Sequence, residues 1–314
     1  MWYDYVFWIS IGLILLILLT SFICFLMTFY VGKRKVLKEG EYDLPPGKEY
    51  EPYYDDMKNW IDKMRNFPYE QVEIKSHDGL TLKAKYFENI KGAPIEIMIH
   101  GYKGNAERDM NGGIFRAFAV GRNALLIDQR GSGDSEGHVL TFGIKERKDV
   151  RLWIDFLIDK FGKDVRIILT GISMGASTAL MTTQENIPSN VIGVLADCGF
   201  SSQKEIISKT IKEMKLPPKL FYPFVKLGGL IFGRFNIDEL TPLDACKNMP
   251  VPVIFFHGDN DNFVPCYMSE DMAKVCSNKN KFVIIPNAEH GLAYPSSQDY
   301  YISKVKEFQK ECNE

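Results

Sequence analysis

The sequence LTGISMGAST, Leu169–Thr178, places a serine between two glycines directly after an apolar run. The residues before Ser173 predict a short buried strand, and those after it predict the start of a helix. Gly171 and Gly175 suit a sharp strand-to-helix turn, because a side chain at either position would collide with neighbouring backbone. This G-x-S-x-G pattern indicates a nucleophilic serine. The alternative is structural, with Ser173 capping the first turn of the helix.

The chain around this turn alternates between short apolar runs and stretches of helical length. Strands are expected at 71–76, 80–87, 95–99, 124–128, 166–170, 191–196, 253–256 and 282–285. Helices are expected at 105–120, 143–160, 174–184, 267–275 and 298–310. An antiparallel hairpin followed by β–α alternation predicts an α/β fold, whose mostly parallel central sheet is covered by helices on both faces. In such sheets ligands bind at the carboxyl ends of the strands.

Polar motifs follow these strand ends, and two of them supply an acid and a base for Ser173. The run HGDNDNFVP, residues 257–265, contains Asp259 and Asp261, and PNAEHGL contains His290. A triad needs a base in contact with the serine and an acid that fixes the tautomer of the base. The order Ser173, Asp261, His290 fits this chemistry. Asp259 and Asp197 remain alternative acids, whereas the other four histidines lie in turns or loops, or precede glycines at strand ends.

Two glycine-containing loops complete the expected site. In HGYKGN, residues 100–105, the Tyr102 N–H can form a two-donor oxyanion hole with the Met174 N–H. The alternative is an ordinary loop in which Asn105 caps the next helix. The loop DQRGSGDSEGH, residues 128–138, lacks the lysine and glycine order of nucleotide sites. We expect it to form a wall of the site, with Arg130 and Asp134 paired.

The N-terminus predicts a membrane anchor. Residues 6–31, VFWISIGLILLILLTSFICFLMTFYV, carry no charge and are long enough to cross a bilayer of ~30 Å. A cleaved signal peptide is the alternative, but its apolar core would be shorter and preceded by basic residues. The basic residues here follow the apolar run, and by the positive-inside rule this places the large domain in the cytoplasm rather than outside the cell. These residues are Lys33, Arg34, Lys35 and Lys38.

Length and composition bound the organisation of the chain. The 314 residues suit one large domain, divided as an anchor (1–38), a juxtamembrane connector (39–69) and a domain (70–314) with an amphipathic insertion at about 198–243. The net charge of −2 gives no reason to expect nucleic acid as a partner. The six cysteines show no zinc-ligand spacing, so we expect neither a metal nor a cofactor.

Taken together, the motifs resemble those of α/β hydrolases, specifically membrane-anchored serine hydrolases of the serine aminopeptidase-like and acyl-thioesterase-like branch. The resemblance rests on HGYKGN, DQRGSGDSEG, GISMG, HGDNDNFVP and EHG in that order, over about residues 70–312. It implies Ser173, Asp261 and His290 as the triad, Tyr102 and Met174 as oxyanion donors, and a helical cap at 198–243. The substrate is inferred from the anchor instead: because it keeps the site beside lipophilic molecules, we expect an ester or thioester of a lipid-like acyl group. A peptidase is the second hypothesis, and a non-catalytic binding protein on the same fold is the third.

Overall fold

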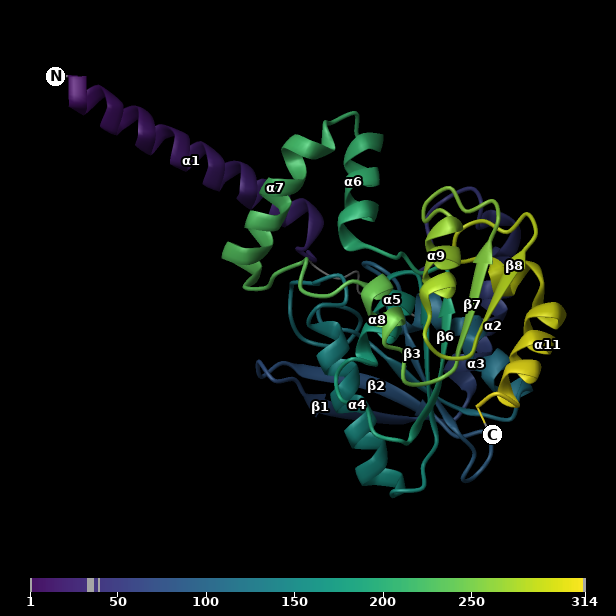
Figure 1. Cartoon of the computed structure of the whole chain (residues 1–314). Coiled ribbons are helices and arrows are strands. Elements are labelled where there is room, and N and C mark those ends of the chain that lie inside the picture. The colour runs from purple at the N-terminus through teal and green to yellow at the C-terminus, as the bar shows by residue number, and fades with distance from the viewer. Residues whose placement is uncertain (1, 33–36, 39, 313–314) are drawn as a thin grey trace.

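The computed structural model describes residues 2–32, 37–38 and 40–312, and an eight-stranded sheet lies at its centre (Figure 1). The strand order is β1-β2-β4-β3-β5-β6-β7-β8. β1 (Glu70–Lys75) pairs with β2 (Thr81–Phe87) and β2 with β4 in antiparallel register. All other neighbouring strands pair in parallel: β4 with β3, β3 with β5, β5 with β6, β6 with β7, and β7 with β8. Their bounds are β3 (Ile95–Ile99), β4 (Asn123–Ile127), β5 (Ile167–Ile172), β6 (Val191–Asp197), β7 (Val253–Gly258) and β8 (Asn280–Ile285). The predicted mostly parallel sheet is confirmed.

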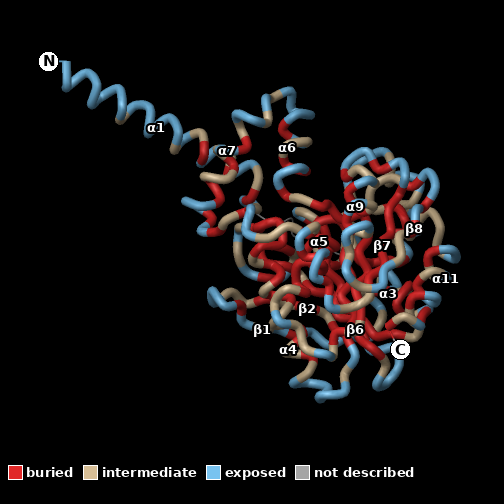
Figure 2. The backbone as a smooth tube through the Cα atoms, viewed as in Figure 1, coloured by how far each residue is buried: buried red, intermediate tan, exposed pale blue. Residues whose placement is uncertain are grey.

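Helices cover both faces of this sheet, and the central strands are therefore buried on both sides (Figure 2). Successive residues of β3 show the alternation: Ile97 and Ile99 belong to one apolar cluster and Met98 to another. One face carries α4 (Glu146–Phe161), α5 (Met174–Thr182), α8 (Pro242–Lys247) and α9 (Tyr267–Val275). The other face carries α3 (Ala106–Ala119), α10 (Ala293–Ser296) and α11 (Gln298–Gln309).

The apolar N-terminal run forms α1 (Trp2–Thr28), which projects away from the sheet (Figure 1). Most of its side chains are exposed, and only Ser21 and Phe25 are buried within it (Figure 2). Within the described ranges it is the one helix long and apolar enough to cross a membrane. The helix begins at Trp2 and ends at Thr28, whereas the sequence predicted it over residues 6–31. Of the four basic residues used to predict orientation, Lys33, Arg34 and Lys35 lie outside the described residues.

The chain directly after α1 is joined to the large domain. The Leu140 N–H donates to the carbonyl oxygen of Phe29 at 3.0 Å, and the Val31 N–H donates to that of His138 at 2.8 Å. The Phe29 side chain is fully buried, with its ring 5.0 Å from that of Phe235. The end of the apolar segment is therefore part of the hydrophobic core.

The segment expected as a connector also folds against the large domain. It contains a 3-10 turn, η1 (Glu51–Tyr53), and α2 (Tyr54–Asn66), which packs on α3. The buried face of α2 consists of Met57, Trp60, Ile61 and Met64, a spacing that places them on one side of a helix. Arg65 at its end forms a 2.6 Å ion pair with Glu107 of α3.

The predicted insertion is helical and lies beside α1 (Figure 1). It contains α6 (Gln203–Glu213), α7 (Pro218–Gly228) and a π-helical turn, η2 (Gly229–Gly233). The buried residues Tyr222 and Val225 of α7 share a cluster with Phe25 and Phe29. The apolar face of the insertion is thus largely used to bind the N-terminal segment.

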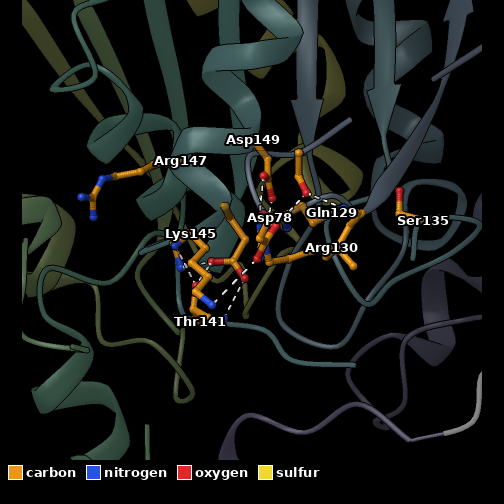
Figure 3. A network of polar contacts seen from close by, with 12 residues as sticks. Asp78, Gln129, Arg130, Ser135, Thr141, Lys145, Arg147 and Asp149 are labelled. Carbon is orange, nitrogen blue, oxygen red and sulfur yellow. Dashed lines mark hydrogen bonds and ion pairs between the residues drawn. The ribbon is translucent and has the colours of Figure 1, made fainter. Parts of the chain in front are cut away.

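The expected pair between Arg130 and Asp134 is wrong. The Arg130 guanidinium lies between Asp149 of α4, at 2.7 and 2.8 Å, and Asp78 of the first hairpin, at 2.9 and 3.2 Å (Figure 3). These two carboxylates occupy the guanidinium, and Asp134 is exposed, with its own N–H donating to Asp128. The arginine holds the pKa of Asp78 far below its usual range, against the opposing effect of burial. Arg130 thus ties the hairpin, this loop and α4 together.

Candidate active site

Ser173 lies at the sharp turn between β5 and α5. Its backbone has φ of 54° and ψ of −121°, a strained conformation for a residue with a side chain. A Cβ on Gly171 would lie 2.2 Å from the Gly175 backbone, and one on Gly175 would lie 2.0 Å from the carbonyl oxygen of Ile99. Only glycine fits at either position. Ser173 precedes the first turn of α5, but its side chain makes no capping hydrogen bond. The alternative prediction, that Ser173 caps this helix, is therefore wrong.

The hydroxyl of Ser173 instead contacts His290. Ser173 Oγ lies 2.9 Å from His290 Nε2, and His290 Nδ1 lies 2.7 Å from Asp261 Oδ2. Since the ionised carboxylate accepts, Nδ1 carries the proton and Nε2 is free to accept from the serine. The three residues come from the ends of β5, β7 and β8, and form one continuous line of hydrogen bonds.

The surroundings of Asp261 keep it ionised. Its Oδ1 accepts hydrogen bonds from the Phe263 and Val264 N–H groups at 2.9 and 2.8 Å, and His257 Nε2 lies 3.2 Å from its Oδ2. Burial alone would raise its pKa, but the bonds from His257 and His290 outweigh burial and lower the pKa to about 2. A carboxylate that stays charged can stabilise an imidazolium at His290.

The alternative acids have other partners. Asp259 Oδ1 accepts from the Asn287 N–H at 2.6 Å, which links the loops after β7 and β8. Asp197 Oδ2 accepts from the Tyr301 hydroxyl at 2.9 Å, and its Oδ1 is buried without a partner in the described structure. Burial raises the pKa of Asp197 to about 6. Neither carboxylate is bonded to a histidine.

The HGYKGN loop lies against the serine turn. A Cβ on Gly101 would be 3.5 Å from that of Ser173, and the Gly101 N–H donates to Asp109 at 2.9 Å. Behind it, His100 Nδ1 bonds the Gly101 carbonyl oxygen at 2.8 Å, and His100 Nε2 accepts from the Gln129 N–H at 3.0 Å. Asn105 caps α3 through the Arg108 N–H at 2.8 Å. The loop therefore contains the capping asparagine of the alternative interpretation, and it also lies beside Ser173.

A cavity of about 450 Å³ opens at this site. Its lining includes Ser173, His290, Tyr102 and Lys103, together with residues of α3 and of the last two helices. The 128–138 loop was expected as a wall, but none of the lining residues comes from it, because its side chains are engaged with the hairpin and α4. None comes from the insertion at 198–243 either, since that segment packs on α1.

The missing wall is supplied by the segment before β1, which sequence reasoning did not place at the site. Pro45, Tyr50, Met57 and Trp60 line the cavity. The Tyr50 hydroxyl donates to the carbonyl oxygen of His290 at 2.9 Å. The signal for the helical part was present as apolar residues at 57, 60, 61 and 64, the spacing of one helix face.

Cys198 is a further neighbour that sequence reasoning missed. In the described ranges, its thiol, Asp261 and His290 are a group whose potential ligand atoms lie within 4.8 Å of one another. Both nitrogens of His290 and both oxygens of Asp261 already have hydrogen-bond partners. Burial raises the pKa of Cys198 well above its usual value, so the thiol stays protonated. A cation bound here would break the bonds between Ser173, His290 and Asp261.

Comparisons with known proteins agree on the fold. The family described as alpha/beta hydrolase fold matches residues 97–231. The uncharacterized protein YqkD of Bacillus subtilis is 25% identical over 256 residues, which are 78% of this chain and 83% of YqkD.

Two solved structures extend this likeness. The Pyrococcus furiosus esterase Pf2001 has a TM-score of 0.66 at 23% identity, covering 90% of this chain and 98% of the esterase. A Mycobacterium tuberculosis puromycin-hydrolyzing peptidase has a TM-score of 0.62 at 16% identity, covering 78% of this chain and 39% of the peptidase. Together with the eight-stranded sheet, these matches show that the chain has an α/β hydrolase fold.

Proposed function

We propose that the protein is a membrane-tethered serine hydrolase that cleaves esters or thioesters of lipid-like acyl groups. One observation carries the proposal: Ser173, His290 and Asp261 are joined by hydrogen bonds of 2.9 and 2.7 Å, and Ser173 and His290 line the cavity. A serine hydroxyl is a weak nucleophile unless an oriented base removes its proton, and this arrangement provides that base.

The reaction follows from these contacts. Ser173 Oγ attacks the acyl carbonyl carbon while its proton passes to His290 Nε2, and Asp261 stabilises the imidazolium. His290 then returns the proton to the departing alcohol or thiol, which leaves Ser173 acylated. Water attacks the acyl-enzyme with His290 as base, releasing the acid and restoring the serine.

The developing oxyanion needs donors fixed in advance, and we assign this role to the Tyr102 and Met174 N–H groups. Met174 is the first residue of α5, where an N–H has no acceptor within the helix. The closeness of Gly101, where a Cβ would lie 3.5 Å from that of Ser173, supports the assignment of the neighbouring Tyr102 N–H. Two such donors, in a site shielded from water, typically supply several kcal/mol of transition-state stabilisation.

The substrate class is inferred from the cavity walls. Met57, Trp60, Ile172 and Tyr294 give the cavity large apolar surfaces that suit an acyl chain. An amide substrate, as for a peptidase, needs the same triad. p-Nitrophenyl acyl esters and aminoacyl anilides, supplied to the same preparation, separate the two, and faster turnover of the anilides would refute the ester assignment.

Membrane tethering is supported by how α1 is used. Its side chains before Ser21 are exposed or half-buried, which is unlike a core helix. If the apolar N-terminal run were cleaved off as a signal peptide, the protein would lose the fully buried Phe29. It would also lose Thr28, whose carbonyl oxygen accepts the hydrogen bond from the Tyr102 hydroxyl. We place the hydrolase domain on the cytoplasmic side, where protease added to intact cells should not reach it. Cleavage under those conditions would reverse the orientation.

The mechanism is tested by a fluorophosphonate probe, which labels activated serines. Wild-type protein should be labelled and Ser173→Ala should not. Ser303→Ala is the control, because Ser303 is exposed and bonds only the Tyr300 carbonyl oxygen of its own helix. Labelling that persists in folded Ser173→Ala would remove this mechanism, as would an unlabelled wild-type protein.

A further inference from the structure

Three consecutive apolar side chains of η2 are exposed beside α1. Leu230, Ile231 and Phe232 are 44%, 43% and 36% exposed, and we call them the η2 patch. They follow α7, whose buried residues pack toward the N-terminal segment. A run of three consecutive, partly exposed large apolar side chains is a candidate surface for contact with a partner.

The η2 patch is continuous with the apolar surface of α1. The Phe232 ring lies 5.0 Å from that of Phe22 and 5.8 Å from that of Phe25. The helices approach closely because Gly228 faces the backbone of α1, where a Cβ would be 2.5 Å from the carbonyl oxygen of Ser21. Small residues permit this kind of helix contact in membranes. The patch therefore has a fixed position along α1.

That position coincides with the expected edge of the hydrocarbon core. Ser21 is the first buried residue of α1, and the preceding stretch, Trp2–Thr20, spans roughly 28 Å at ~1.5 Å per residue. A hydrocarbon core is ~30 Å thick. Trp2, Tyr3 and Tyr5 at the far end suit the opposite interface. The near edge of the core then falls at Phe22, the residue that contacts Phe232.

We propose that the η2 patch inserts into the boundary between headgroups and acyl chains of the bilayer that α1 crosses. This inference rests on the proposed membrane tethering. The partner is phospholipid, because the patch adjoins the lipid-exposed surface of α1 at the depth where interfacial helices bind. The η2 patch thus holds the enzyme against the membrane at a second point, in addition to α1.

The arrangement also orients the active site. Tyr102 and Lys103 line the cavity, and both bond the last carbonyl oxygens of α1, those of Thr28 at 2.8 Å and Met27 at 3.2 Å. The cavity wall therefore reaches the end of α1 that meets the membrane surface. An acyl substrate leaving the bilayer has a short path to Ser173.

Photocrosslinking tests the contact directly. The full chain, with Ile231 replaced by p-benzoylphenylalanine, is reconstituted into phosphatidylcholine vesicles with labelled lipid. The control replaces Ile284 of β8, which is 45% exposed and lies far from the insertion in sequence. We expect a lipid adduct at position 231 and none at 284. A dimer adduct at 231 would assign the patch to a second copy, and no adduct, or equal adducts at both positions, would also overturn the proposal.

Turnover supplies an independent test. We expect Ile231→Ser to lower hydrolysis of a long-chain ester held in vesicles by about fivefold, since losing one apolar side chain weakens interfacial binding. Hydrolysis of a soluble p-nitrophenyl ester and fluorophosphonate labelling should be unchanged, and Ile284→Ser should change neither. Equal rates for wild type and Ile231→Ser on the vesicle ester would refute the proposal. Failure of the proposed function gives different results. Loss of the proposed catalysis abolishes labelling of the wild type, and loss of membrane tethering leaves the wild type unbound to the vesicles.

Discussion

The Tyr102 hydroxyl donates a 2.8 Å hydrogen bond to the main-chain carbonyl oxygen of Thr28, which joins the proposed oxyanion loop to the last turn of α1. The final carbonyl groups of a helix lack intrahelical donors, so this bond satisfies one of them. The Tyr102 ring also lies 5.1 Å from that of Phe142, which in turn contacts Phe29. The N-terminal helix is therefore attached to the part of the site that would bind the oxyanion.

We expect Tyr102→Phe to lower kcat while leaving KM almost unchanged. The variant keeps the ring and the N–H group but loses the bond to Thr28. One hydrogen bond contributes about 1 kcal/mol, which corresponds to roughly fivefold in rate if it holds the N–H in position. Steady-state kinetics on a soluble p-nitrophenyl ester measure the effect.

Tyr30→Phe is the control for this change, since Tyr30 is exposed and its ring stacks on His138 away from the loop. A transition-state analogue such as a boronic acid should bind Tyr102→Phe more weakly, by the same factor as the fall in kcat. Equal kcat for the two variants would show that the bond does not position the donor.

The sequence predicted the sheet and the meeting of Ser173, His290 and Asp261 because both depend on local signals. Buried strands appear as short apolar runs, and the turn at Ser173 excludes any residue but glycine at two positions. The carboxyl ends of parallel strands then bring distant motifs together. The place after β7 does not distinguish Asp261 from Asp259, and it is the resemblance to α/β hydrolases that favours Asp261.

The packing of the N-terminal segments was not predictable in the same way. The apolar run shows that α1 is long enough for a membrane, but nothing local reveals that Phe29 is buried against Phe142 and Phe235. The wall formed by Tyr50 and Trp60 likewise depends on a contact between segments far apart in the chain. For the same reason the sequence did not reveal that the apolar face of the insertion packs on α1, nor that none of its residues lines the cavity.

Asp261→Asn should reduce kcat/KM by on the order of 10³–10⁴, since an amide no longer fixes the tautomer of His290 or stabilises its charge. Asp259→Asn is the matched control. The asparagine oxygen can still accept from the Asn287 N–H, so activity should stay within about threefold of wild type. Rates of fluorophosphonate labelling measure both, and comparable losses in the two variants would remove Asp261 from its assigned role.

The stability of the protein should depend on pH through Asp197. Its pKa is about 6 in the folded state, whereas an aspartate in an unfolded chain ionises near ~3.9. The folded state thus binds a proton that the unfolded state has lost, so stability falls as pH rises from ~4 to ~6. The loss persists above that range, because the buried carboxylate is then charged.

Asp197→Asn should remove this part of the pH dependence. At pH ~8 the variant should be more stable than wild type by roughly 1–3 kcal/mol, and at pH ~4 the two should be similar. Asp149, whose burial also raises its pKa to about 6, keeps its own contribution in both proteins. Thermal unfolding across this range measures the difference, and parallel curves for the two proteins would contradict it.

Trp60 should control the acyl length that the cavity accepts. Its indole is packed against Tyr294, with ring centroids 5.6 Å apart, and it lines the cavity. We expect Trp60→Phe to enlarge the cavity and shift the preferred p-nitrophenyl ester toward longer chains. Trp153→Phe is the control, because Trp153 is fully buried on α4 and does not line the cavity. It should lose stability without changing the chain-length profile, and an unchanged profile for Trp60→Phe would place the acyl chain elsewhere.

The contact between α1 and α7 should contribute to the stability of the fold. A Cβ on Gly228 would lie 2.5 Å from the Ser21 carbonyl oxygen and 3.0 Å from the Phe25 Cβ, so Gly228→Leu must push the helices apart. Overpacking of this kind costs typically about 1–3 kcal/mol. In detergent micelles the midpoint of thermal unfolding should fall by several degrees, and turnover should fall with it as Thr28 moves away from Tyr102.

Gly12→Leu is the control, because it makes the same change on α1 at a position where a Cβ would meet nothing within 4 Å. It should leave the unfolding midpoint and the turnover unchanged. Equal midpoints for the two variants would mean that α1 is only a tether.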